Sequence, residues 1–140
     1  MKELSSVLLV EDDDTVNFYN QFLLKELGVA KKIVIKENGE EALSYLEECQ
    51  KDEAAGFPEL IFLDINMPVM NGFEFLDAYA DQKMTDAPGA LIVMLTTSLH
   101  PSDMERAKTY SFISEYIFKP LTSEKVERIL EKYFPKDAAR

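Results

Sequence analysis

Acidic side chains follow two apolar segments of this chain, and they are the residues best suited to chemistry. Residues 7–10 run directly into Glu11 and Asp12, and residues 60–63 run into Asp64. A short, continuous apolar segment is typical of a strand buried on both faces of a parallel sheet. Taken alone, Asp64 is equally compatible with a simple turn residue, since Asp is common after strands. Carboxylates gathered at strand ends can also bind a hard cation.

A hydroxyl and an ammonium follow two further apolar segments. Residues 91–95 precede Thr96, and residues 116–118 precede Lys119. A parallel sheet brings its carboxyl ends to one edge, where ligands bind in open α/β sheets. If the first, third and fourth strands are neighbours, three carboxylates, a hydroxyl and an ammonium converge there.

Such a cluster needs positive charge. Two carboxylates about 4 Å apart repel by roughly 4 kcal/mol at an effective dielectric constant near 20. A lysine or a bound cation can offset this repulsion. Oxygen ligands favour Mg²⁺, and the sequence offers no Cys/His cluster for zinc. If a cation rather than the lysine offsets the carboxylates, these ligands therefore favour Mg²⁺.

Helical patterns separate the apolar segments and indicate which elements position these residues. A further strand is predicted at 32–36, and helices at 15–27, at 40–49, after Gly72, at 101–111 and at 123–133. Asp13 or Asp14 is a candidate N-cap of the first helix. The expected buried face of that helix consists of apolar residues at three- and four-residue steps: Val16, Tyr19, Phe22, Leu23 and Leu27. Five alternations of strand and helix predict a parallel sheet with helices on both faces and right-handed crossovers.

Composition limits the class of protein. With 140 residues, we expect one domain over 1–140 with a core of about 7–133. The net charge of −11 argues against a nucleic-acid partner. No apolar segment is long enough to span a membrane and the start lacks a signal-peptide core, so we expect a cytoplasmic protein. One cysteine, Cys49, excludes an internal disulfide.

Taken together and in order, these motifs resemble the response-regulator receiver domain of two-component signal transduction. The resemblance covers about 7–133 and rests on four features. They are the acidic pair Glu11-Asp12, the motif Asp64-x-x-Met67-Pro68-x-x-x-Gly72, Thr96 after the fourth strand, and Lys119-Pro120 after the fifth. Each feature is weak alone, but the four in this order are specific.

The resemblance implies a flavodoxin-like, doubly wound, five-stranded sheet in the order 2-1-3-4-5. It implies that Asp64 accepts a phosphoryl group, assisted by Thr96 and Lys119. The implied Mg²⁺ ligands are Glu11, Asp12, Asp64 and the backbone carbonyl of Asn66. The resemblance also implies a cis Lys119-Pro120 bond, and a switch in which the ring of Tyr116 turns inward when Thr96 engages phosphate.

The expected function is a stand-alone phospho-acceptor switch. Its donor would be a sensor histidine kinase or a histidine phosphotransfer protein. Its output would be phosphorylation-dependent contact with an unidentified downstream protein, or phosphate relay, because no output domain follows Tyr133. It would not be an enzyme beyond its own phosphorylation and dephosphorylation. Long loops at 51–58 and 81–89, with Thr96-Thr97-Ser98, resemble single-domain receivers paired with phytochrome-type kinases. Glu11 stands where many receivers have Asp.

Two alternatives remain open. A pseudo-receiver, an interaction module that never takes phosphate, would typically lack one of the acids, the threonine or the lysine, and none is missing here. A haloacid-dehalogenase-like phosphatase also uses an Asp nucleophile on an α/β sheet. That family requires Asp-x-Asp, and Asn66 occupies the second position.

Overall fold

Strands and helices alternate five times in the part of the chain that the structure describes, as predicted. The computed structural model describes residues 3–52, 56–85 and 90–135. The elements are β1 (Leu4–Val10), α1 (Asp14–Glu26), β2 (Ala30–Lys36), α2 (Gly39–Lys51), β3 (Leu60–Leu63), α3 (Gly72–Asp81), β4 (Leu91–Thr96), α4 (Pro101–Lys108), β5 (Ile113–Phe118) and α5 (Ser123–Tyr133). The long loops expected at 51–58 and 81–89 include residues 53–55 and 86–89, which lie outside the described part. No helix in the described ranges is long and apolar enough to cross a bilayer.

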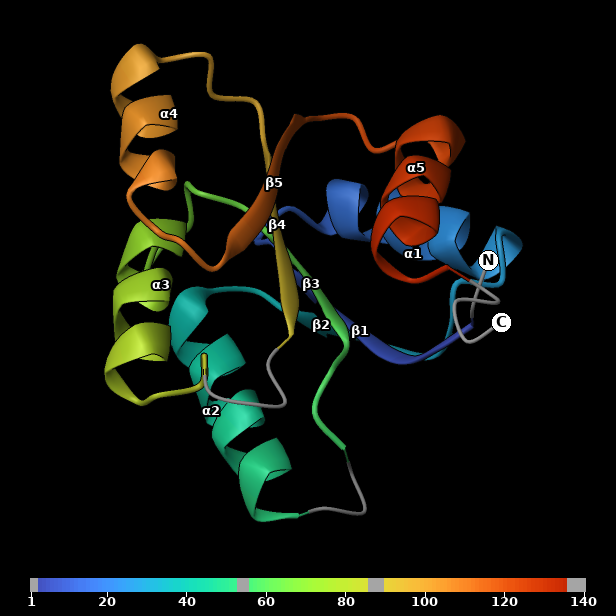
Figure 1. The fold of residues 1–140 in the computed structure, drawn as a ribbon, viewed down its shortest axis with the longest axis horizontal. Coiled ribbons are helices and arrows are strands. Elements are labelled where there is room, and N and C mark those ends of the chain that lie inside the picture. Colours follow the sequence, from blue (N-terminus) through green and yellow to red (C-terminus); the bar gives the residue numbers. More distant parts are fainter. Residues whose placement is uncertain (1–2, 53–55, 86–89, 136–140) are drawn as a thin grey trace.

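The five strands form one parallel sheet in the order β2-β1-β3-β4-β5, with β3 at its centre (Figure 1). This is the flavodoxin-like topology that the resemblance implied. The chain starts in β1, fills the sheet on one side with β2, and then returns to build β3, β4 and β5 on the other. The reversal of strand order falls between β1 and β3, and ligands bind at such a point in doubly wound folds.

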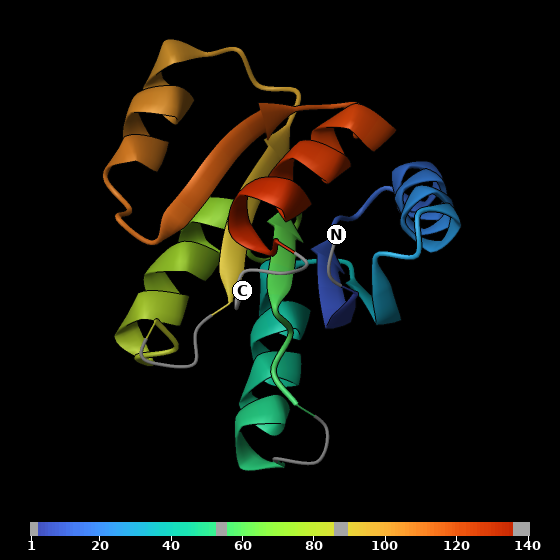
Figure 2. The same ribbon diagram turned by 45° about the vertical axis from the view of Figure 1, so that its right-hand side comes forward.

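Helices cover both faces of the sheet: α1 and α5 lie on one face, and α2, α3 and α4 on the other (Figures 1 and 2). Alternate residues of β1 face the two layers, since Leu8 and Val10 pack with α2 and α3, whereas Val7 and Leu9 pack with α1 and α5. All four residues of β3 are buried. Each fully buried aliphatic side chain contributes roughly 1.5 to 3 kcal/mol of transfer free energy, which holds the central strand firmly.

The first helix begins immediately after the acidic pair. The Asp13 carboxylate accepts hydrogen bonds from the backbone N–H of Thr15 at 2.8 Å and of Val16 at 3.1 Å, so Asp13 is the N-cap. This resolves the predicted choice between Asp13 and Asp14. It also assigns Asp13 to helix capping and leaves Glu11 and Asp12 at the sheet edge.

The predicted buried face of α1 is partly wrong. Tyr19 is 43% exposed and Phe22 59% exposed, while Asn17, Asn20 and Leu24 are the buried residues of the helix. A backbone acceptor just beyond the end of β1, the carbonyl of Glu11, accounts for the burial of Asn17, and the Tyr19 hydroxyl donates to the Leu121 carbonyl. The Asn17 side-chain amide donates to the Glu11 carbonyl at 2.8 Å, which compensates for its burial. Val16, Leu23 and Leu27 are half-buried, so the apolar pattern located the helix but misjudged its rotation.

Candidate functional site

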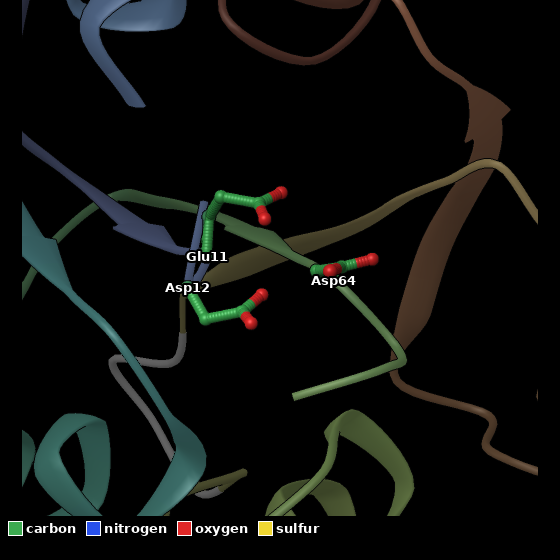
Figure 3. Close-up of side chains that lie close together, drawn as sticks. All are labelled: Glu11, Asp12 and Asp64. Atoms are coloured by element: carbon green, nitrogen blue, oxygen red, sulfur yellow. The ribbon is translucent and has the colours of Figure 1, made fainter. Parts of the chain in front are cut away.

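The register of β1 and β3 brings Glu11 and Asp64 side by side. Val10 pairs with Leu63, the last residue of each strand, and the Asp64 N–H donates to the Val10 carbonyl at 3.0 Å. Glu11 and Asp64 are buried, with exposures of 4% and 7%, whereas Asp12 is exposed. One carboxylate oxygen from each of the three residues lies within 4.8 Å of the others (Figure 3). The sheet edge therefore carries the acidic cluster that the sequence predicted.

Lys119 reaches this cluster from β5. Phe118 pairs with Thr96 in the sheet, and the Lys119 N–H donates to the Thr96 carbonyl at 2.9 Å. The Lys119 ammonium then lies 2.5 Å from Glu11 Oε1 and 3.6 Å from Asp64 Oδ2. The Lys119-Pro120 peptide bond is cis, as the resemblance implied. The predicted offset of the carboxylates by a lysine is thus present.

The site carries more negative than positive charge. Burial raises the pKa of Glu11 above its usual range, although Lys119 opposes the shift. Burial also raises the pKa of Asp64, again against Lys119, and the charge of Asp12 adds to the increase. Three carboxylates around one ammonium leave an excess of negative charge that a cation can neutralise. The donors are all hard oxygens with no thiolate or imidazole, so the cluster fits Mg²⁺.

Backbone contacts fix the acidic side chains. Asp64 Oδ1 accepts from the Ile65 N–H at 2.9 Å, and Glu11 Oε2 accepts from the Asp13 N–H at 3.1 Å. Gly72 brings the start of α3 against the same loop, with its N–H donating to the Ile65 carbonyl at 2.8 Å. A Cβ atom at position 72 would lie 2.3 Å from the Asp64 carbonyl oxygen. The glycine of the Asp64…Gly72 motif is therefore required for close approach.

Thr96 and Tyr116 are connected through one residue between them, Ser98. Thr96 is fully buried at the end of β4, and its Oγ1 accepts from the Ser98 N–H at 3.0 Å. The hydroxyl of Tyr116, which is half-buried on β5, donates to the Ser98 carbonyl at 3.3 Å. Asn66 is exposed, two residues beyond Asp64. The sequence did not identify the Ser98 link, because Ser98 takes part through its backbone N–H and carbonyl.

The sequence interpretation also missed two buried amides behind the cluster. Asn17 holds the Glu11 carbonyl, and Asn20 lines a small cavity of about 10 Å³ with Glu11 and Asp64. The signal was available, because two Asn residues three positions apart share one face of a helix. Polar residues at that spacing, beside a strand end that carries unpaired backbone groups, indicate a side chain that serves the backbone.

Comparisons with known proteins agree with this geometry. The response regulator receiver domain family matches residues 7–131. A solved two-component response regulator from Cytophaga hutchinsonii superposes with a TM-score of 0.82 at 31% identity, covering 94% of this chain and 97% of that one. The phosphorylated cyanobacterial phytochrome response regulator RcpA gives a TM-score of 0.74 at 28% identity, covering 92% and 93%.

Curated relatives show the same relationship at the level of sequence. A probable methanogenesis regulatory protein of Methanothrix harundinacea is 28% identical over 127 residues, which is 90% of this chain and 79% of the relative. The chain spans about half the length of several other curated relatives that it matches. The strand order, the matched family and these relatives lead to one conclusion: the chain belongs to the response regulator receiver domain family of two-component systems.

Proposed function

We propose that this chain is a phosphorylation switch in which Asp64 accepts a phosphoryl group. One observation carries the proposal: Asp64 is buried at the end of the central strand, 3.6 Å from the Lys119 ammonium and within 4.8 Å of the Glu11 and Asp12 carboxylates. This arrangement supplies a fixed nucleophile and fixed charges. Phosphoryl transfer requires mainly positioning and charge neutralisation.

The chemical step is a displacement at phosphorus. A carboxylate oxygen of Asp64 uses a lone pair to form an O–P bond while the bond from phosphorus to the donor atom breaks. The electron pair of that bond leaves with the donor, which is a histidine nitrogen in the natural reaction. Lys119 offers positive charge to the phosphoryl oxygens, and Thr96 at the end of β4 offers a hydroxyl donor.

The Mg²⁺ ligands we propose are Glu11, Asp12, Asp64 and the backbone carbonyl of Asn66. When bound, Mg²⁺ neutralises the carboxylates and the incoming phosphoryl oxygens. The donor set supports this assignment because all of its atoms are hard oxygens. The exposed position of Asp12 leaves one side of the cluster open to solvent and to a donor.

The proposed partners are a sensor histidine kinase or a histidine phosphotransfer protein upstream, and an unidentified protein downstream. Signalling would occur in the cytoplasm through protein contact or phosphate relay, without catalysis on other substrates. The proposed output face is α4-β5-α5. Support comes from the link between Thr96 and Tyr116 through Ser98. A groove of about 400 Å³ also lies between α4 and β5, and its lining combines apolar residues such as Met104 and Phe118 with the charged residues Lys108 and Glu115. Pairing with a phytochrome-type kinase remains a prediction.

The test is direct phosphorylation by a small-molecule donor. The purified chain is incubated with acetyl phosphate, with Mg²⁺ or with EDTA, and its intact mass is recorded. We expect a gain of one phosphoryl group that depends on Mg²⁺. An unlabelled protein that still binds Mg²⁺ would instead support a pseudo-receiver.

A further inference from the structure

Side chains from two helices hold the backbone around Lys119. The ammonium of Lys125, on α5, donates to the carbonyls of Phe118 at 2.7 Å and Pro120 at 3.0 Å, the residues immediately before and after Lys119. The hydroxyl of Tyr19, on α1, donates to the carbonyl of Leu121 at 2.7 Å. Three carbonyls within four residues therefore accept hydrogen bonds from side chains that the proposed chemistry does not use.

These carbonyls lie at and beyond the end of β5, where the sheet no longer supplies partners. In an ordinary surface loop, water would satisfy them. An ammonium carries three donors and no acceptor, and its hydrogen bonds to carbonyls are charge-assisted. A single Lys125 side chain bonded to both neighbours of Lys119 therefore restricts the backbone on each side of that residue.

The position of Lys125 in α5 is unfavourable for the helix itself. Thr122 is the N-cap and accepts from the Lys125 N–H at 3.2 Å, which makes Lys125 the third helical residue. After a Thr N-cap, Glu or Gln at that position would complete a capping box. Positive charge in the first turn also opposes the helix dipole. A residue that contradicts local helix preferences suggests a role elsewhere.

We infer that Lys125 and Tyr19 are positioning residues for Lys119. Lys125 binds the two carbonyls that flank Lys119 and Tyr19 binds the Leu121 carbonyl next to them, and together these contacts direct the Lys119 ammonium to Glu11 and Asp64. The expected effect on the rate of phosphorylation rests on the proposed function, whereas the expected effect on the placement of the Lys119 ammonium does not. The Lys119 ammonium can lie 2.5 Å from Glu11 Oε1 only if the backbone of Lys119 is correctly placed. Small displacements of a charged group in such a site reduce rates strongly.

The variants are Lys125→Met, which keeps the length of the side chain without its donors, and Tyr19→Phe, which removes one hydroxyl. Matched controls are Lys132→Met and Tyr133→Phe on α5, whose polar groups bind Glu115 rather than the Lys119 loop. Lys125→Arg retains several donors and serves as the conservative rescue. Lys119→Met gives the rate of phosphorylation in the absence of the Lys119 ammonium.

The kinetic readout is the rate of labelling by acetyl phosphate, compared with Mg²⁺ affinity from titration calorimetry. We expect labelling to slow on the order of tenfold in Lys125→Met, as for other residues that orient a site residue, and less in Tyr19→Phe. Mg²⁺ affinity should not fall, because all the proposed metal ligands are retained and a displaced Lys119 competes less for Glu11 and Asp64. Lys125→Arg should recover most of the rate. Wild-type labelling in Lys125→Met, or equal slowing in Lys132→Met, would overturn the inference.

A second readout does not depend on phosphorylation. The NMR signals of the Lys119 ε-methylene group report whether its ammonium is held in the ion pair with Glu11. The chemical shifts of these signals should move toward those of a free lysine in Lys125→Met and stay unchanged in Lys132→Met. Unchanged signals in Lys125→Met would refute the positioning role, whereas failure of the wild type to take phosphate would refute only the proposed function.

Discussion

Replacing Asp64 by Asn should make the metal-free protein more stable. Asp64 is buried among carboxylates, and its pKa is raised chiefly by burial, so its ionised form is disfavoured in the folded protein. Asn has nearly the same shape and can still accept the hydrogen bond that Asp64 Oδ1 receives from the Ile65 N–H. The substitution therefore removes charge while keeping packing.

The size of the effect follows from opposing terms. The Asp64 and Glu11 carboxylates have oxygens within 4.8 Å of each other, and the Lys119 ammonium lies 3.6 Å from Asp64. At an effective dielectric constant near 20, the repulsion and the attraction are each roughly 3 to 5 kcal/mol. Water screens the contribution of the exposed Asp12. The repulsion and the attraction nearly cancel, so the cost of burying the Asp64 charge determines the sign of the stability change. We expect a gain of about 1 to 2 kcal/mol, or roughly 3 to 8 °C in Tm for a domain of this size.

The dependence of stability on pH provides a second measurement of the sign. A carboxyl whose pKa is raised in the folded state stabilises the protein below its ordinary pKa of about 4, and this contribution is lost as pH rises through the folded pKa. As pH rises from about 4 through the folded pKa of Asp64, the free energy of unfolding should therefore fall more steeply for the wild type than for Asp64→Asn. The assay is thermal unfolding in EDTA across this range, with Glu131→Gln, an exposed residue on α5, as control. A lower Tm for Asp64→Asn than for wild type at neutral pH would refute the reasoning.

Three further predictions test other parts of the account. Mg²⁺ should raise the Tm of the wild type, because it binds the folded cluster and not the unfolded chain, and it should raise that of Asp12→Asn much less; an equal response in thermal-shift titration would remove Asp12 from the metal site. Gly72→Ala should destabilise the protein by about 3 kcal/mol or more in urea unfolding, since its Cβ would lie 2.3 Å from the Asp64 carbonyl oxygen; a loss below about 1 kcal/mol would contradict the close approach. Phosphorylation should change amide exchange over 101–133 more than over 32–49, and equal changes in the two ranges would argue against the α4-β5-α5 output face.

Much of the fold could be predicted because its signals are local or ordered along the chain. The buried segment at 60–63 is apolar throughout and became the central strand β3. Glu11, Asp64 and Lys119 each follow a strand and Thr96 ends one, and parallel strands must bring such residues to one edge. The strand order itself came from the resemblance, because alternation alone does not determine which strands are neighbours.

What could not be predicted depends on partners distant in sequence or on backbone atoms. Asn17 is buried because its amide donates to the Glu11 carbonyl, whereas Tyr19 and Phe22 on the same helix are exposed. The apolar periodicity of a helix gives no information about a backbone carbonyl outside that helix. The Lys125 contacts with the Phe118 and Pro120 carbonyls are likewise invisible in a sequence, where Lys125 resembles any surface lysine.

The most direct test of the central claim asks which carboxylate takes the phosphoryl group. Wild type, Asp64→Asn and Asp13→Asn are incubated with acetyl phosphate and Mg²⁺, and their intact masses are compared. Asn caps a helix as well as Asp does, so Asp13→Asn keeps α1 intact while changing a neighbouring acid. We predict that wild type and Asp13→Asn gain the mass of one phosphoryl group and that Asp64→Asn gains none. Full labelling of Asp64→Asn would contradict the assignment of Asp64 as the acceptor.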